Sequence, residues 1–441
     1  MAATTITTAM DFISIHGHPS STTTPTTPDE KHQEKNWLSI CSFPGKGRGF
    51  VATQQIPAGT IVHTAEPLAA VVSQEWIPET CAWCFHFTYP KKMKYKMEMK
   101  VSTTCLQKKK KKQHPRSTTM TSKDVLFCSE SCQQKYQTYG YHKNESELLL
   151  RCFHALEQVY HQRREKQTSN DNEDILHHDM NKFIKDLLHQ KVDIHNDEQL
   201  RHWIDQAWTT FVQHYHQGQA TQTWMPDDAE RTMLRLVACC VGRRQMEAEY
   251  LFPELPVTVS TFNDLFQVQC NELAYIRRIL LDVDHENESR KEKRILDALF
   301  DIMQMYIFFL SATSDFLDCP HTLFRAIYFR EMANSFGLWE MASKQEEEDG
   351  NVTDDLELLG WGIYPSAVYF NHACDANIRK IRKGRQMVFI SKRVIEQGEE
   401  ACISYGCVED TVQERRKRLL EHYHFLCACT RCEQEASSSS E

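Results

Sequence analysis

The spacing of hydrophobic positions changes twice along the chain. From Trp37 onward, apolar and β-branched residues form short runs at 50–52, 61–63 and 68–72, and glycines and prolines separate these runs. Runs of this kind predict β-strands. Because so few strands cannot bury their own apolar face, the rest of this β domain must come from elsewhere in the chain.

Between positions 145 and 345 the apolar residues recur every three or four positions, with few internal glycines or prolines. This spacing predicts a mainly helical middle third. A charged stretch at 344–355 then predicts an exposed loop, and strand-like runs return at 385–390 and 401–405. The predicted fold class is therefore α+β, with one β domain opened by insertions.

Three segments have compositions that do not favour a packed core. Residues 1–35 are rich in Ser, Thr, Pro and charge, and residues 434–441 are mostly serine and charge, so both predict disordered tails. A basic insertion at 91–116 contains a run of lysines. A solvated loop is the main interpretation of this insertion, and a nuclear-import or polyanion-binding role is the alternative.

Charge and hydropathy narrow the functional classes. The chain has 441 residues, with Lys+Arg 51 against Asp+Glu 60, which gives a net charge of −9. No apolar run approaches the roughly 18 residues that a membrane span needs, and the N-terminus lacks a secretory signal. We expect an intracellular monomer, in the nucleus and/or cytoplasm, with no membrane and no sequence-specific nucleic-acid partner. The negative net charge is compatible with basic protein substrates.

The 17 cysteines give the first chemical signal. Thiols stay reduced inside cells, so clustered cysteines favour a metal site. Cys81 and Cys84 form one close pair, and Cys128 and Cys132 form a second after a long gap. Two such pairs are typical of zinc knuckles, and they predict one zinc site, which we call the N-terminal cysteine cluster.

A second group lies near the C-terminus, where Cys427, Cys429 and Cys432 fall within six residues. Zinc requires four ligands, and Cys374 is the leading candidate for the fourth. We call these four residues the C-terminal cysteine cluster. Four thiolates leave no open position on the metal, so this zinc is expected to be structural. The remaining nine cysteines are expected to be mostly core residues.

Four motifs occur in order: GKGRGF at 45–50, NHACDAN at 371–377, GEEACISYG at 398–406 and CACTRC at 427–432. Together they resemble the SET-domain lysine methyltransferases. The zinc segment after the first motif makes the chain similar to the SET and MYND subfamily, over about residues 37–433.

The resemblance implies a β-rich SET domain that is split by a MYND-like zinc module and a large helical insert and closed by a zinc-binding post-SET segment. The implied boundaries are a disordered tail at 1–35, the N-terminal part of the SET domain at 36–76, the MYND-like zinc module with its basic insertion at 77–152, the helical insert including the SET insert region at 153–350, the C-terminal part of the SET domain at 351–410, the post-SET segment at 411–433 and a disordered tail at 434–441.

The resemblance also implies a cofactor, S-adenosylmethionine, and a set of site residues. The implied cofactor contacts are Lys46, Gly47, Arg48, Asn334, Asn371, His372, Tyr405 and Phe425. The implied catalytic positions are Tyr405, beside the transferring methyl group, with Tyr423 and Phe336 as walls of a lysine channel.

The chain also departs from the family pattern. Ala373 and Ala376 stand where the family usually has Ser and Pro. A MYND module normally binds two zinc ions, whereas this chain keeps ligands for one, and Ser146 occupies the position expected for a last cysteine. The chain therefore predicts two structural zinc sites, with a third MYND-type site lost, in a compact member without the helical C-terminal extension of the longer relatives.

Methyl transfer to an amine is an in-line displacement, so the enzyme must align the reactants and keep the acceptor amine neutral. Neutralising a lysine of pKa about 10.4 at pH 7 costs roughly 4.6 kcal/mol. A narrow apolar channel lowers this cost because it disfavours the ammonium.

The resulting hypothesis is a protein-lysine N-methyltransferase that transfers methyl groups from S-adenosylmethionine to lysine side chains of histone or other protein substrates. The alternative is a catalytically weak SET/MYND adaptor that acts through protein–protein interaction. A plant-type non-histone enzyme or a histidine methyltransferase is a third interpretation, which the CACTRC motif disfavours.

Overall fold

The computed structural model describes residues 36–102, 117–140, 142–167, 192–216, 224–249, 260–281, 288–341 and 356–438. Apart from Asn36, these belong to one unit, Trp37–Glu441. The tail predicted at 1–35 and the lysine run of the basic insertion lie outside the described residues.

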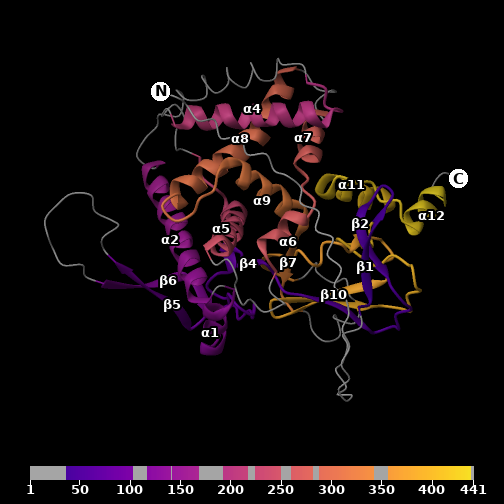
Figure 1. Cartoon of the computed structure of the whole chain (residues 1–441), viewed down its shortest axis with the longest axis horizontal. Helices are drawn as coiled ribbons and strands as arrows, with labels where there is room; N and C mark the ends of the chain where they lie inside the picture. Colours follow the sequence, from indigo (N-terminus) through magenta and orange to yellow (C-terminus); the bar gives the residue numbers. More distant parts are fainter. Residues whose placement is uncertain are drawn as a thin grey trace, which may run out of the picture. The chain divides into compact units, whose positions relative to one another are not determined.

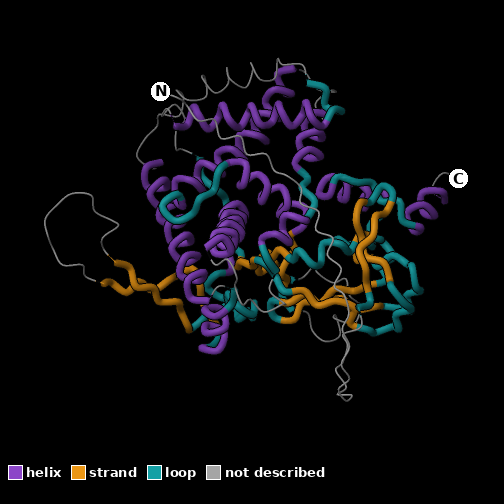
Figure 2. The backbone as a smooth tube through the Cα atoms, viewed as in Figure 1, coloured by secondary structure: helices purple, strands orange, loops and turns teal. Residues whose placement is uncertain are grey.

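Strands from both ends of the chain build the β domain, and Figure 2 draws the strands in orange. They are β1 Leu38–Phe43, β2 Gly47–Ala52, β3 Ile61–Ala65, β4 Ala69–Val72, β8 Leu358–Ile363, β9 Asn371–His372, β10 Ile378–Lys383, β11 Gln386–Ser391 and β12 Cys402–Ile403. β3 pairs with β11 and β4 pairs with β8, in both cases antiparallel. The prediction that the early strands need distant partners is therefore confirmed.

The short strands β9 and β12 run parallel and pair Asn371 with Cys402 and His372 with Ile403. This pairing brings the NHACDAN and GEEACISYG motifs side by side. A separate hairpin, β5 Tyr95–Ser102 with β6 Ser117–Phe127, is followed by helix α1 Glu130–Thr138. This hairpin and α1 lie within the predicted zinc module.

The middle of the chain is helical, as its spacing predicts. Its helices are α2 His142–Gln167, α4 Asp197–His216, α5 Asp228–Glu249, α6 Phe262–Gln267, α7 Glu272–Leu281, α8 Glu288–Thr313 and α9 His321–Asn334. Helix α5 packs against α2, α8 and α9 and also against β4 (Figure 1). It therefore joins the helices to the β domain, and for that reason a run of its residues from Leu234 to Arg243 is buried on all sides.

Three details differ from the sequence boundaries. Residues Ser335–Trp339 form strand β7 inside the predicted helical insert, because they pair with β8 and bury Leu338. Helix α2 begins at His142, within the predicted zinc module. Helix α12, Thr430–Ser438, covers part of the predicted tail at 434–441, because ion pairs hold its Glu435 in place.

Helix α11, Val412–Tyr423, begins with a capping box in which Thr411 and Glu414 bond to each other's backbone N–H. It ends at His424, which takes a left-handed conformation and turns the chain toward the last cysteines. None of the helices in the described part of the chain is long and apolar enough to cross a membrane.

Candidate functional site

The C-terminal cysteine cluster brings together a loop after β9 and the segment around the start of α12. The four sulfur atoms lie within 4.8 Å of one another. The Sγ of Cys374 is 3.9 Å from that of Cys427 and 3.4 Å from that of Cys432. Four thiolates at about 2.3 Å from a tetrahedral zinc are about 3.8 Å apart, so this donor set fits zinc.

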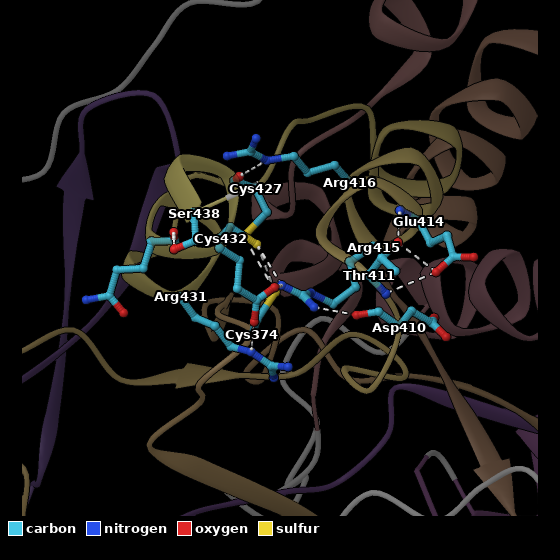
Figure 3. A network of polar contacts seen from close by, with 12 residues as sticks. Cys374, Asp410, Thr411, Glu414, Arg415, Arg416, Cys427, Arg431, Cys432 and Ser438 are labelled. Atoms are coloured by element: carbon cyan, nitrogen blue, oxygen red, sulfur yellow. Dashed lines mark hydrogen bonds and ion pairs between the residues drawn. The ribbon is translucent and has the colours of Figure 1, made fainter. Parts of the chain in front are cut away.

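A buried arginine supports this cluster from α11 (Figure 3). The Arg415 guanidinium lies 3.5 Å from the Cys432 sulfur and 2.6 Å from the Glu435 carboxylate. Glu435 also accepts a hydrogen bond from Arg431 at 2.7 Å. The positive charge of Arg415 offsets the charge of the thiolates, and its two partners fasten α11 to α12.

The N-terminal cysteine cluster has a similar geometry. The Sγ of Cys128 lies 3.6 Å from both Cys84 and Cys132, and all four sulfur atoms, including that of Cys81, lie within 4.8 Å. Ser129 caps α1 by accepting a hydrogen bond from the Cys132 N–H, which places the Cys132 thiol. Among the described residues these two clusters are the groups that could hold a metal.

His372 connects the C-terminal cysteine cluster to an aromatic group. Its Nδ1 accepts a hydrogen bond from the Tyr405 N–H at 3.1 Å, so its Nε2 carries the ring proton and faces the Cys374 sulfur at 3.3 Å. Burial, with help from neighbouring cations such as Arg415, lowers the pKa of His372 to about 4. A neutral His372 thus links the C-terminal cysteine cluster to the backbone of Tyr405.

Tyr405 lies at the centre of that aromatic group. Its ring centroid is 4.7 Å from Tyr423, 5.4 Å from His372 and 6.4 Å from Phe425. Its hydroxyl donates a hydrogen bond to the Phe370 carbonyl at 2.9 Å. Burial raises the pKa of Tyr405 above its usual value, so the hydroxyl stays protonated. A cavity of about 170 Å³ opens between Tyr405, Tyr423 and α11.

A carboxylate holds two of the predicted cofactor residues in place. Glu400 accepts a hydrogen bond from the Lys46 ammonium at 2.6 Å with one oxygen and from the Asn371 amide at 2.9 Å with the other. Burial lowers the pKa of Lys46, but the bond to Glu400 outweighs it and the net shift is upward. Sequence reasoning missed Glu400, although its place just before β12 in the GEEACISYG motif was a usable signal.

The glycines of the first motif allow this approach. Gly47 has φ +78°, a conformation that side chains rarely adopt. A Cβ on Gly49 would overlap the amide nitrogen of Asn371 and come within 2.9 Å of the Phe43 ring. β2 can therefore lie against Asn371 only without a side chain at position 49.

Arg48 and Asn334 both contact the segment after α6. The Arg48 guanidinium donates to the Gln267 carbonyl and lies 5.2 Å from the Tyr369 ring. The Asn334 amide donates to the carbonyls of Gln269 at 3.2 Å and of Arg330 at 2.8 Å. These two predicted cofactor residues therefore share a loop, and their polar groups bind backbone oxygens.

Phe336 lies on β7 and is connected to the aromatic group around Tyr405 through a series of ring contacts. Its ring centroid is 5.4 Å from Tyr364 and 6.3 Å from Phe389. Phe389 stacks on Phe370 at 4.3 Å, and Phe370 accepts the Tyr405 hydroxyl. An aromatic wall thus runs from Tyr405 to Phe336.

A larger cavity, of about 680 Å³, lies between the helices and the aromatic group. Tyr423 and Ser335 line the part of this cavity beside the site, and residues of α5 and α9 line other parts of it. Its lining includes Glu230, Tyr328, Glu331 and Trp361. This cavity is large enough for a peptide side chain and opens next to the site.

The comparisons with known proteins agree with this geometry. The SET domain family matches residues 262–406, which include Asn334, Phe336, Asn371, His372 and Tyr405. The match leaves out the GKGRGF motif and the last cysteines, although the structure places both beside the matched residues.

Three relatives illustrate the similarity. The potential protein lysine methyltransferase SET6 of Saccharomyces cerevisiae is 27% identical over 416 residues, 92% of this chain and 98% of that protein. A SET and MYND domain-containing protein of Dictyostelium discoideum is 32% identical over 26% of each chain. The histone-lysine N-methyltransferase SMYD3 of Mus musculus is 34% identical over 24% of this chain and 25% of its own. The last two matches thus span only about a quarter of those relatives.

Proposed function

We infer that this chain, a compact member of the SET and MYND domain-containing family, is a protein-lysine methyltransferase that uses S-adenosylmethionine. The single observation that carries this proposal is the meeting of three distant motifs at one aromatic site. Asn371 and His372 pair with the strand that leads to Tyr405, and Lys46 reaches the same place through Glu400.

S-adenosylmethionine, when bound, supplies an electrophilic methyl group. We propose that Lys46, Gly47, Arg48, Asn334, Asn371, His372, Tyr405 and Phe425 hold it. The residues suit such a ligand, because the glycine motif exposes backbone beside Asn371 and because Phe425 offers an aromatic face. Glu400 is added to this set as the residue that orients Lys46 and Asn371.

Tyr405, Tyr423 and Phe336 are proposed to enclose the acceptor lysine. Their rings exclude water and disfavour an ammonium, so the acceptor amine loses its proton more easily than in solution. The Tyr405 hydroxyl donates to the Phe370 carbonyl, so the direction of its dipole is fixed, and such a preorganised dipole would stabilise charge that develops beside it. Alignment and charge control are the main contributions of these residues.

We propose that each chain binds two structural zinc ions, one in each cysteine cluster, and that the third MYND-type site is lost. The C-terminal zinc holds the segment that carries Tyr423 and Phe425. Because thiolate sites of this kind require a reducing compartment, we place the protein inside the cell, in the nucleus or cytoplasm.

The proposed substrates are lysine-containing proteins, histones among them, and the protein is proposed to act as a monomer. The cavity of about 680 Å³ carries Glu230 and Glu421 among its aromatic residues. Carboxyl and aromatic groups together suit a basic polypeptide. The adaptor alternative explains neither the buried Tyr405 hydroxyl nor the Glu400 link, so the enzyme is the better hypothesis.

The experiment is methyl transfer from labelled cofactor to histones and to cell extract. Tyr405→Phe removes the hydroxyl and keeps the ring, so we expect transfer to fall roughly 100-fold while cofactor binding in calorimetry is retained. Tyr89→Phe makes the same chemical change on an exposed ring and is the control.

If the unmodified chain shows no methyl transfer and no cofactor binding, the enzyme proposal is contradicted. Equal transfer by the parent and by Tyr405→Phe would remove Tyr405 from the catalytic set and leave the enzyme proposal in place.

A further inference from the structure

Lys380 lies on the face of β10 that points toward the proposed site. In the β10–β11 ladder Lys380 pairs directly with Phe389, so both side chains project from the same face. Phe389 stacks on Phe370, whose carbonyl accepts the Tyr405 hydroxyl. The register of one strand pair thus turns a lysine toward the aromatic wall.

The amine of Lys380 reaches that wall. Its Nζ lies 5.6 Å from the centroid of Phe336, one of the proposed channel residues. The amine therefore lies against a wall of the proposed channel.

This amine has no acceptor among the residues that the structure describes. Other inward-facing cations are paired, as Arg243 is with Glu145 and Arg325 is with Glu272. The neighbours of Lys380 that face it are Ile378 and Arg382 on its own strand, Phe389 on β11 and Phe336 on β7, and none of them is an acid.

Lys380 also combines two properties that are rarely found together. Its side chain keeps exposed surface, yet burial among protein atoms lowers its pKa to about 8. The amine lies beside the Phe336 ring while part of the side chain stays exposed. A lowered pKa leaves more of the amine neutral at a given pH than in an ordinary lysine.

We propose that Lys380 is a methyl acceptor within this chain, methylated by the chain's own active site. The Lys380 nitrogen forms a bond to the methyl carbon, the bond between that carbon and the sulfonium sulfur breaks, and one N–H proton leaves to water. The products are methylated Lys380 and S-adenosylhomocysteine. This inference rests on the proposed function. Lys380 also competes with an external lysine for the same methyl group.

The test is peptide mass spectrometry of the full-length protein after incubation with S-adenosylmethionine. We expect methyl groups on Lys380 of the parent chain. Lys380→Arg should lower total self-methylation to below about a tenth, because an arginine stays protonated. Lys383→Arg is the matched control, since Lys383 is exposed on the same strand and projects from its opposite face. It should leave self-methylation unchanged.

A mixing experiment shows whether transfer occurs within one chain. A tagged Tyr405→Phe chain, which retains Lys380, is incubated with the Lys380→Arg chain. We expect no methylation of the tagged Lys380, and in the parent protein we expect a rate that does not depend on protein concentration. The rate should rise with pH and level off above pH about 8, where the Lys380 amine is neutral. Methylation of the tagged Lys380 would overturn transfer within one chain.

Two failures are distinguishable. If histones or extract proteins are methylated while Lys380 stays unmodified, or if Lys383→Arg lowers self-methylation as much as Lys380→Arg does, this inference is wrong and the proposed function stands. If nothing is methylated and no cofactor binds, the proposed function itself is wrong. A gain in histone methylation by Lys380→Met would support competition between Lys380 and external lysines for the methyl group.

Discussion

At the residue scale, single atoms decide how the site is assembled. The two oxygens of Glu400 hold Lys46 and Asn371, and the two nitrogens of His372 join Tyr405 to Cys374. Each of these groups uses both of its polar atoms, so a substitution at either position disconnects two partners. This is the reason that a few residues from distant motifs form one rigid arrangement.

The first prediction concerns Gly49. Gly49→Ala places a Cβ against the amide nitrogen of Asn371, so the amide must leave Glu400. We expect cofactor affinity, measured by calorimetry on folded protein, to fall by about tenfold, equivalent to about 1.4 kcal/mol. Ser39→Ala, an exposed change on the neighbouring strand β1, is the control for calorimetry. If the Gly49→Ala variant binds the cofactor with unchanged affinity, the Asn371 amide does not contribute to the cofactor site.

The second prediction concerns Glu331, a fully buried carboxyl whose Oε2 has no hydrogen-bond partner among the described residues. Burial raises its pKa well above the usual value. The folded state therefore keeps a proton that the unfolded state releases above pH about 4.5, so the free energy of unfolding falls as pH rises beyond that point.

Glu331→Gln should remove this dependence, which can reach about 1.4 kcal/mol per pH unit. Urea unfolding at several values between pH 5 and 8 measures it, with the exposed Glu409→Gln as control. Parallel stability curves for the parent and Glu331→Gln would show that Glu331 is ionised in the folded protein.

At the element scale, the C-terminal cysteine cluster joins two short helices to the β domain. Helices α11 and α12 are short, and a small separate core forms around Cys374, Val412, Leu419 and Cys427. Tyr405, Tyr423 and Phe425 pack against this core. The order of the aromatic site thus depends on the C-terminal cysteine cluster.

The third prediction follows from this dependence. Cys432→Ala removes a ligand and leaves Arg415 without its sulfur partner, so we expect bound zinc to fall from two ions per chain to one and methyl transfer to fall at least about tenfold. Cys41→Ala, outside both clusters, is the matched control. Full methyl transfer with one zinc per chain would show that the aromatic site does not depend on the C-terminal metal.

At the scale of the whole molecule, Arg385 links the zinc module to the β domain. Its guanidinium carbon lies 4.3 Å from the centroid of Trp83 and 4.1 Å from that of Tyr139, between two rings of the zinc module. Arg382, from the neighbouring strand, adds hydrogen bonds to the carbonyls of Cys84 and Phe85. The module is therefore fixed to the β domain by cations as well as by apolar packing.

The fourth prediction is that Arg385→Met lowers the free energy of unfolding by about 2 kcal/mol, because a buried cation between two rings is lost. Trp fluorescence during urea unfolding measures this change. Arg393→Met, which removes an exposed ion pair with Glu399, should cost less than about 1 kcal/mol. Equal losses in the two variants would mean that the contacts of Arg385 with the Trp83 and Tyr139 rings do not contribute to the free energy of unfolding.

The sequence alone determined much of this protein. Cysteine spacing gave both ligand sets, since zinc ligands leave a local signature whatever the distance between their pairs. Apolar spacing gave the helical middle and the strands at both ends, because burial of one face imposes a local period. The motifs gave the resemblance to the SET and MYND family before any geometry was known.

Only the tertiary structure decided the rest. The pairing of β9 with β12, the placement of β7 beside β8 and the role of Glu400 join residues that lie far apart in the chain. The position of Lys380 depends on a strand register, and a shift of one residue would turn it to the opposite face. Such contacts arise from long-range packing, which no local pattern of residues records.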